Sequence, residues 1–538
     1  MPDRPIQALT IAVDRPRSLD RAWSPASWLA GSRAALALLY AIPIMFMAGY
    51  LFPPINHDVA TLIDIARRWI AGERLYAEVI DVNPPLTIIL HAIPVLLEHW
   101  TGLAATTWWV MLTMAAVVSA ALACRQLVAL APYGKGHLAR DAVPLVVLFV
   151  MAAAQSQEFG QREHFMLLAG IPYALLAGIR AHRRPPHKLA LAVAIAAGLG
   201  FALKPYFLVI PALIEGYLLL RRGPRAALRD PVPWIIGAWV AVHAGIMLFL
   251  TPAYLTYTYP IAVGTYLAIG MGPLDVLFGS AMAATTIALM ILTPIAFFLR
   301  REPGFATLCL FAVGGVISCV AQGKGWDYHA MPAVSGTIIL LAALVVDQLD
   351  RWLATAAAAP QRVTALAGSL LALVAYPYFL VNPPFAYQQR YEGSIARQLG
   401  DVIAVESPNR RIMALSPGIY PFFPTVEYEK AYLAGRFATM WPIQGLYAEC
   451  LPNGHLYRDL DTAPAIEKQV FTAVIDDFIK AKPDILFVDR IPGIPRCATE
   501  VFDYLAYFSR DPRFAAAMKN YDFAYEFDRY NIWRRKRD

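Results

Sequence analysis

Four polar clusters interrupt an otherwise apolar chain, and each stands where an apolar run ends. Asp58 is an isolated carboxylate that could take a proton from an attacking hydroxyl group. Lysine and arginine side chains that converge with histidine would suit a phosphate group. Ionisable residues at a membrane edge are costly, so they are candidates for function by default. The clusters are His57-Asp58, Gln161-Arg162-Glu163-His164, Lys204 and the segment GKGWDYH, residues 323–329.

Asp58 and His57 also have plain structural explanations. Asp58 precedes the apolar pattern of an amphipathic helix and could be its N-cap. A lone histidine is more often a satisfied interfacial side chain than a metal ligand, and neither HxxxH nor HExxH spacing occurs here. Asp64 and Arg68 are spaced i,i+4, which predicts a structural ion pair on the outer face of the same helix.

The basic clusters have alternatives as well. Arg162 and Glu163 could pair only with each other or cap a turn between two helices. Lys204 directly precedes a proline at the end of an apolar helix, and its plain explanation is snorkelling to the interface. Lys324 could also snorkel, but the glycines on either side of it indicate an unusual turn or a close backbone approach.

The elements that position these residues are membrane helices. The chain has 538 residues, of which 58% are hydrophobic and 16% charged. A soluble domain usually carries about 25% charged residues. The net charge of +7 reflects basic loops and not a nucleic-acid surface. Helices are predicted near 34–52, 104–124, 142–156, 164–180, 189–203, 205–220, 234–251, 275–299, 305–321, 329–347 and 361–381.

The basic loops set the predicted orientation. Residues 1–33 form a cytoplasmic leader, and helix 34–52 crosses outward as an uncleaved signal. Residues 53–103 stay outside, with an interfacial helix at about 85–100. About eleven crossings then leave the C-terminus outside, with every polar cluster on the outer face. The alternative, in which 85–100 spans the membrane, places the basic loops YGKGHLARD and RAHRRPPHK outside and violates the positive-inside rule.

The apolar runs stop near residue 384, and residues 385–538 are predicted to form an extracytoplasmic α/β domain. RRIMALS and KPDILFVD have the pattern of short buried strands, and AIEKQVFTAVIDDFIKA that of a helix. Cys450 and Cys497 both fall in this domain and could pair if it is exported, although spacing alone leaves this open.

Three segments together resemble a known group of enzymes. AGERLYAEVIDVNPPL resembles the first external loop of polyprenyl-phosphate-sugar-dependent glycosyltransferases, the GT-C membrane enzymes of the protein O-mannosyltransferase and aminoarabinose-transferase group. GLGFALKPYFLVIP resembles their glycine-rich helix that ends in lysine, and KGWDYHAMP resembles their late lysine and tyrosine segment. The resemblance covers roughly residues 34–350. It implies a GT-C-like domain over 34–384, with about 11–13 membrane helices in a polytopic α-helical protein.

The resemblance also implies roles for single residues. Asp58 would act beside the acceptor as base or orienting group, Lys204 would approach the donor phosphate, and Lys324 and Tyr328 would help to bind the lipid phosphate. Asn83 stands where the aminoarabinose-transferase branch has lysine, so that branch's acceptor recognition does not transfer. The family tends to have Arg and Asp in the QREH turn, and either Glu163 or His164 could match the acid.

The resulting hypothesis is an inverting glycosyltransferase at the outer face of the cytoplasmic membrane. The donor is a polyprenyl-phosphate sugar, and the acceptor is a lipid, a glycan or a protein. No metal is obligatory, although a divalent cation at phosphate oxygens is compatible with the site. A transporter or flippase, and a polymerase or ligase that uses a diphosphate-linked donor, remain as alternatives. The predicted phosphate-binding residues are Arg162, His164, Lys204, Lys324, Tyr328 and His329, with His57, Glu163 and Asn83 on the acceptor side.

Overall fold

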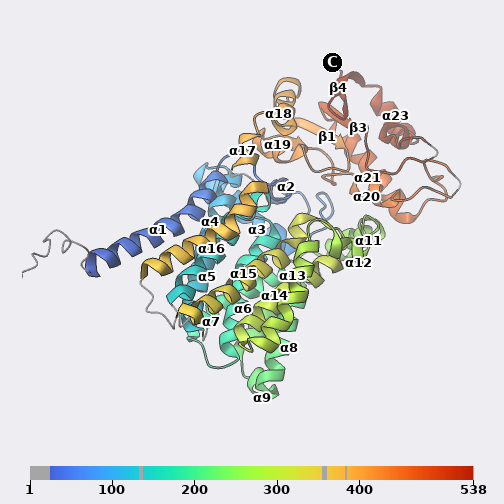
Figure 1. Ribbon diagram of the computed structural model, residues 1–538. Helices are drawn as coiled ribbons and strands as arrows, with labels where there is room; N and C mark the ends of the chain where they lie inside the picture. Colours follow the sequence, from blue (N-terminus) through green and yellow to red (C-terminus); the bar gives the residue numbers. More distant parts are fainter. Residues whose placement is uncertain are drawn as a thin grey trace, which may run out of the picture.

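The computed structural model describes residues 25–131, 137–353, 360–381, 385–452, 454–497 and 499–536. A bundle of long helices makes up the first part, and a sheet with surrounding helices caps one end of that bundle (Figure 1). The loops and short helices that follow the first long helix lie between the two parts (Figure 1). This junction is where the candidate chemistry gathers.

The bundle contains long helices and several short connecting ones. In chain order they are α1 (Pro25–Gly49), α2 (His57–Ile70), α3 (Pro85–Thr101), α4 (Ala105–Leu130), α5 (His137–Ala152), α6 (Arg162–Arg180), α7 (His187–Ala202), α8 (Val209–Arg222), α9 (Pro224–Leu228), α10 (Pro231–Gly245), α11 (Tyr259–Gly264), α12 (Pro273–Phe278), α13 (Ala283–Pro294), α14 (Pro303–Gln322), α15 (Asp327–Leu353) and α16 (Pro360–Val381).

Four stretches of helix are long and apolar enough to cross a membrane, and shorter apolar helices accompany them. Helix α6 is buried along nearly its whole length and lies at the centre of the bundle. At Gly315 the backbone of α14 meets that of α15, since a Cβ there would lie 2.7 Å from the amide nitrogen of Ala333. The four stretches are Ala105–Leu130, Pro231–Leu250, Pro303–Gln322 and Asp327–Trp352.

Two predicted helices differ from the observed ones. The first helix begins at Pro25, inside the predicted leader, and ends at Gly49. The single helix predicted over 275–299 is wrong, because the chain breaks between α12 and α13. Gly279 has an extended backbone at that break, and a Cβ there would lie 2.5 Å from the carbonyl oxygen of Asp275. Apolar composition did not reveal the break.

The second part is built on a mixed five-stranded sheet. Its strand order is β2-β1-β3-β5-β4, with β1 parallel to both β2 and β3, and β5 antiparallel to both β3 and β4. The strands are β1 (Arg411–Leu415), β2 (Tyr432–Leu433), β3 (Ile485–Asp489), β4 (Tyr521–Phe527) and β5 (Tyr530–Arg535). The helices are α17 (Ala386–Gln389), α18 (Ile395–Glu406), α19 (Phe422–Tyr428), α20 (Trp441–Leu446), α21 (Ala465–Ala481), α22 (Tyr504–Phe508) and α23 (Pro512–Met518).

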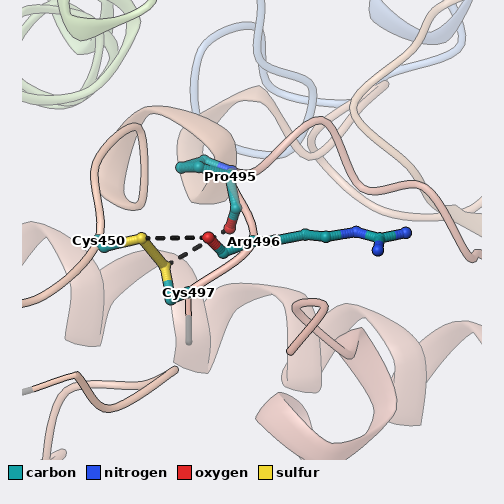
Figure 2. Close-up of a disulfide and its surroundings, with 4 residues drawn as sticks. All are labelled: Cys450, Pro495, Arg496 and Cys497. Atoms are coloured by element: carbon teal, nitrogen blue, oxygen red, sulfur yellow. Dashed lines mark hydrogen bonds between the residues drawn. A yellow bond between two sulfur atoms is a disulfide. The ribbon is translucent and has the colours of Figure 1, made fainter. Parts of the chain in front are cut away.

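The predicted fold class, a polytopic helical membrane protein with a C-terminal α/β part, is confirmed. The two predicted strands are β1 and β3, and the predicted helix is α21. The β4–β5 hairpin was not predicted, because its alternation is half-exposed and carries many charges. Cys450 and Cys497 form a disulfide, beside the backbone of Pro495 and Arg496 (Figure 2).

Candidate active site

Asn56, and not Asp58, caps α2. The Asn56 Oδ1 atom accepts hydrogen bonds from the backbone N–H groups of Asp58 and Val59, at 2.9 and 3.2 Å. The explanation of Asp58 as an N-cap is therefore wrong, and its carboxylate remains available for other contacts. His57 is half-buried, with Nε2 3.7 Å from Asp58 Oδ1.

Gln161 connects Asp58 to the loop before α6. Its Nε2 donates to Asp58 Oδ2 at 2.9 Å and lies 3.4 Å from Glu158 Oε2. Asn56 Nδ2 donates to the same Glu158 oxygen at 3.2 Å. Burial, together with the nearby Asp58 carboxylate, raises the pKa of Glu158 to about 7. A proton can therefore be held one hydrogen-bonded side chain away from Asp58 near neutral pH.

Lys204 lies at the centre of a buried cluster made by four different elements. Its Nζ donates to Glu163 Oε1 at 2.5 Å and to Gln322 Oε1 at 3.0 Å, and lies 3.4 Å from His329 Nε2. Glu163 comes from the first turn of α6, Gln322 ends α14, and His329 lies in the first turn of α15. Glu163 is fully buried, so the Lys204 ammonium is its main compensating charge.

Arg162 is held from the other side of the site. Its Nη1 donates to Asn83 Oδ1, and Asn83 Nδ2 in turn donates to Asp81 Oδ1. Tyr76 fixes the Asn83 backbone by donating to its carbonyl oxygen at 2.7 Å. Burial raises the pKa of the Asp81 carboxyl. Asn83 thus orients a cation, which differs from its expected place on the acceptor side.

The two cations share one site with Asp58. Both Arg162 and Lys204 lie within electrostatic reach of Asp58. The Tyr328 ring lies between them, 5.5 Å from Lys204 Nζ and 6.0 Å from Arg162 Cζ. Within the described ranges, the buried Arg162 Nε and His329 Nδ1 atoms have no hydrogen-bond partner. A phosphate oxygen would satisfy such donors.

His164, which the sequence predicts to bind phosphate, makes its hydrogen bonds outside this cluster. Its Nδ1 accepts from the Gly160 N–H at 3.0 Å, and its Nε2 lies 2.8 Å from the carbonyl oxygen of Met151. Both ring nitrogens are therefore used to hold the turn between α5 and α6. Glu163, which contacts Lys204, is the acid that reaches the site.

Lys324, which the sequence also predicts to bind phosphate, is held by backbone carbonyl groups. Its Nζ donates to the carbonyl oxygens of Tyr266, at 2.6 Å, and Ile269, and lies 4.0 Å from the Tyr266 ring centroid. Positive φ angles at Gly323 and Gly325, 62° and 64°, turn the chain around it. Burial lowers the pKa of Lys324 to about 8. Lys324 therefore orders the loop 266–269 beside the site.

A cavity of about 460 Å³ extends to the group around Asp58 at Glu158. Its walls come from α1, the loop between α5 and α6, α15 and α17. Its apolar residues come mainly from α1 and α15, and its polar residues mainly from the loop between α5 and α6. Glu158 belongs both to this cavity and to the group around Asp58. Residues that line it include Phe46, Tyr50, Gln157, Glu158, Met331, Val334, Ile338 and Arg390.

Sequence reasoning missed three of these residues as site members, and it gave Gln161 no role although it named Gln161 in a polar cluster. Gln322 is a lone polar residue at the end of an apolar helix, directly before GKGWDYH, and that position was a usable signal. Glu158 lies in the predicted outer turn, yet nothing local separates it from ordinary turn residues. Asp81 was hidden because its connection to Arg162 runs through Asn83.

Metal binding has no geometric support in the part of the chain that the structure covers. No three His, Cys, Asp or Glu side chains come together there as a metal site. The divalent cation that the sequence left open therefore stays a prediction.

Comparisons with known proteins place the fold. No protein-family model matches the chain, and no curated protein matches it in sequence. Two solved structures match over 95% of this chain and 98% of their own, each with a TM-score of 0.54. They are ArnT from Cupriavidus metallidurans bound to undecaprenyl phosphate, at 9% identity, and the same protein in the apo state, at 11%. At these identities the likeness shows the fold, which is the GT-C fold that the sequence resemblance predicted.

Proposed function

We propose that this chain is an inverting glycosyltransferase that moves a sugar from a polyprenyl-phosphate donor to an acceptor at the outer face of the cytoplasmic membrane. The observation that carries the proposal is the buried group of Arg162, Lys204 and His329 within electrostatic reach of Asp58. One solved protein of the same fold binds undecaprenyl phosphate, which supports a phosphate in this group.

The donor phosphate would lie against Lys204 and Arg162. Without a donor, Lys204 donates to Glu163 and Gln322, and Arg162 donates to Asn83. Within the described ranges, Arg162 Nε has no hydrogen-bond partner. As the bond between the sugar C1 and the phosphate oxygen breaks, negative charge builds on the departing phosphate. Fixed cations aimed at that charge stabilise the transition state.

Asp58 would act on the acceptor. Its carboxylate takes the proton from the acceptor hydroxyl while that oxygen forms the new bond to C1, and polyprenyl phosphate leaves from the opposite side. Gln161 fixes one carboxylate oxygen of Asp58 at 2.9 Å. His57 lies 3.7 Å from the other oxygen and would orient the acceptor.

The cavity supports a position for the acceptor. It meets the Asp58 group at Glu158 and is lined by residues of α1 and α15. Its apolar wall would accommodate a lipid-anchored acceptor better than a soluble one, because membrane helices supply that wall. The disulfide between Cys450 and Cys497 supports an exported C-terminal part, since disulfides persist in oxidising compartments.

The test is transfer in lipid nanodiscs from a panel of labelled polyprenyl-phosphate sugars, with total membrane lipid as acceptor source. The expected result is label in the acceptor fraction together with release of polyprenyl phosphate. Absence of both for every donor, combined with uptake of a labelled lipid phosphate across vesicles, would replace this proposal with the transporter alternative.

A further inference from the structure

The C-terminal part holds α2 before its first turn. The backbone N–H of Ile55 donates to the Tyr428 hydroxyl at 2.7 Å. Tyr428 is the last residue of α19, and Asp58 lies three residues after Ile55 in the chain. This contact ties the approach to the candidate base directly to the C-terminal part.

The same part also holds α2 at its last turn. Arg67 Nη2 donates to Glu427 Oε2 at 2.8 Å, and its Nε lies 3.4 Å from Glu427 Oε1. Arg67 Nη1 donates to Glu98 Oε2 of α3 at 2.7 Å. One guanidinium thus joins α2, α3 and α19. The Glu427 side chain is only 4% exposed, so removal of Arg67 leaves a buried carboxylate without its partner.

Further contacts come from the segment that follows α19. Arg68 Nη1 donates to the carbonyl oxygen of Gly435 at 3.0 Å, and the Arg68 guanidinium lies over the Tyr432 ring. Beyond α2, the backbone N–H of Ile80 donates to the carbonyl oxygen of Arg436 at 2.8 Å. The segment 427–436 therefore contacts the chain before, at the end of and after α2.

The position of α2 decides where Asp58 lies relative to the cations. Arg162 and His329 lie on α6 and α15 and Lys204 lies between α7 and α8, whereas Asp58 lies on α2. Asp58 and Arg67 lie on one helix, about 14 Å apart along its axis at 1.5 Å per residue. A tilt at the Arg67 end therefore moves the Asp58 carboxylate, and a misplacement of about 1 Å can cost 10²-fold in rate.

We propose that the C-terminal part positions Asp58 through α2, and that Arg67 is the positioning residue. The catalytic readout rests on the proposed glycosyl transfer, but the placement of α2 can be measured without it. A domain that only covered the site would need no buried ion pair with the helix that carries the base.

The experiment compares full-length wild type with Arg67→Gln and Glu427→Gln in nanodiscs. Turnover should fall by about 10²-fold while the donor KM changes little, because the cations remain in place. Arg67→Lys should restore part of the turnover. Arg74→Gln is the control, since Arg74 lies on the same outer segment with its side chain 76% exposed.

The position of α2 is measured separately, by labelling a His57→Cys variant with a membrane-impermeant maleimide. The chain suits this, because its native cysteines are buried or in the disulfide. Arg67→Gln should change the labelling rate severalfold, and Arg74→Gln should leave it unchanged. Unchanged labelling together with unchanged turnover would overturn the positioning role. Absence of transfer in wild type with an altered labelling rate would remove the proposed function and keep the positioning role.

A measurement of the melting temperature will show whether Arg67→Gln folds. If it does not fold, Glu427→Gln tests the positioning role instead. This variant keeps the side-chain shape and removes only the charge. A folded Glu427→Gln protein with wild-type turnover and labelling would overturn the proposal.

Discussion

Lys204 Nζ lies 2.5 Å from Glu163 Oε1, and both groups are buried where α6, α14 and α15 meet the turn before α8. The lysine comes from a break between two helices, and the glutamate from the first turn of another. A cation placed in this way can neutralise Glu163 in the free protein and a donor phosphate in the complex.

Lys204→Gln should weaken donor binding by about 10- to 100-fold, because a hydrogen bond to a charged group contributes about 1.5–3 kcal/mol. The measurement is titration of nanodisc protein with undecaprenyl phosphate. Lys188→Gln, at an exposed lysine, should bind as wild type does. Equal affinity of Lys204→Gln and wild type would count against the phosphate role.

Asp58→Asn should lower turnover by about 10²- to 10⁴-fold, the usual contribution of a general base. The melting temperature should hardly change, because Asn56 and not Asp58 caps α2. The matched variant Asn56→Ala should lose about 0.5–2 kcal/mol of stability. Full turnover by Asp58→Asn in the same transfer assay would exclude the base assignment.

Asp64 should make stability depend on pH. Burial raises its pKa to about 7, against the opposing effect of Arg68, and burial also raises the pKa of the nearby Glu427. Because the folded state favours the protonated carboxyl, Asp64 stabilises the fold fully below about pH 4. This stabilisation is lost as the pH rises toward 7. The melting temperature, measured from pH 4 to 8, should depend less on pH in Asp64→Asn than in wild type. Asp522→Asn, at an exposed carboxylate, should keep the wild-type slope.

Loss of the disulfide should destabilise the C-terminal part by about 2–5 kcal/mol. The bond joins Cys450 and Cys497, which are 47 residues apart in sequence. Denaturant unfolding of Cys450→Ser, followed by tryptophan fluorescence, measures the effect. Dithiothreitol should shift wild type to the same midpoint and leave Cys450→Ser where it is. A variant midpoint equal to that of oxidised wild type would contradict the prediction.

Filling the cavity should reduce transfer to the acceptor without changing the binding of the donor. Met331→Trp places a larger side chain at the cavity wall formed by α15. Label transferred to membrane lipid should fall, while undecaprenyl phosphate binding stays constant. Leu341→Trp, on an exposed face of the same helix, is the control. Parallel loss of donor binding in Met331→Trp would assign the cavity to the donor.

Much of this arrangement could be predicted from local pattern. Asp58 and Lys204 stood out because ionisable side chains at the ends of apolar runs are costly and rare. The strands β1 and β3 and the helix α21 were found because period and composition differ between strands and helices. The predicted pair of Asp64 with Arg68 was not observed as a hydrogen bond, since Arg68 donates to Glu73 at 2.6 Å and only interacts electrostatically with Asp64.

The sequence by itself determined the membrane helices, the end of the bundle at which polar residues gather, and the identity of the candidate base. These follow from hydropathy, helix length and charge, which are properties of short segments. Tertiary structure alone decided the partners: Glu163 for Lys204, Asn83 for Arg162, loop carbonyls for Lys324 and Glu427 for Arg67. Each pairing joins residues far apart in the chain, and the packing of helices fixes which buried charge meets which.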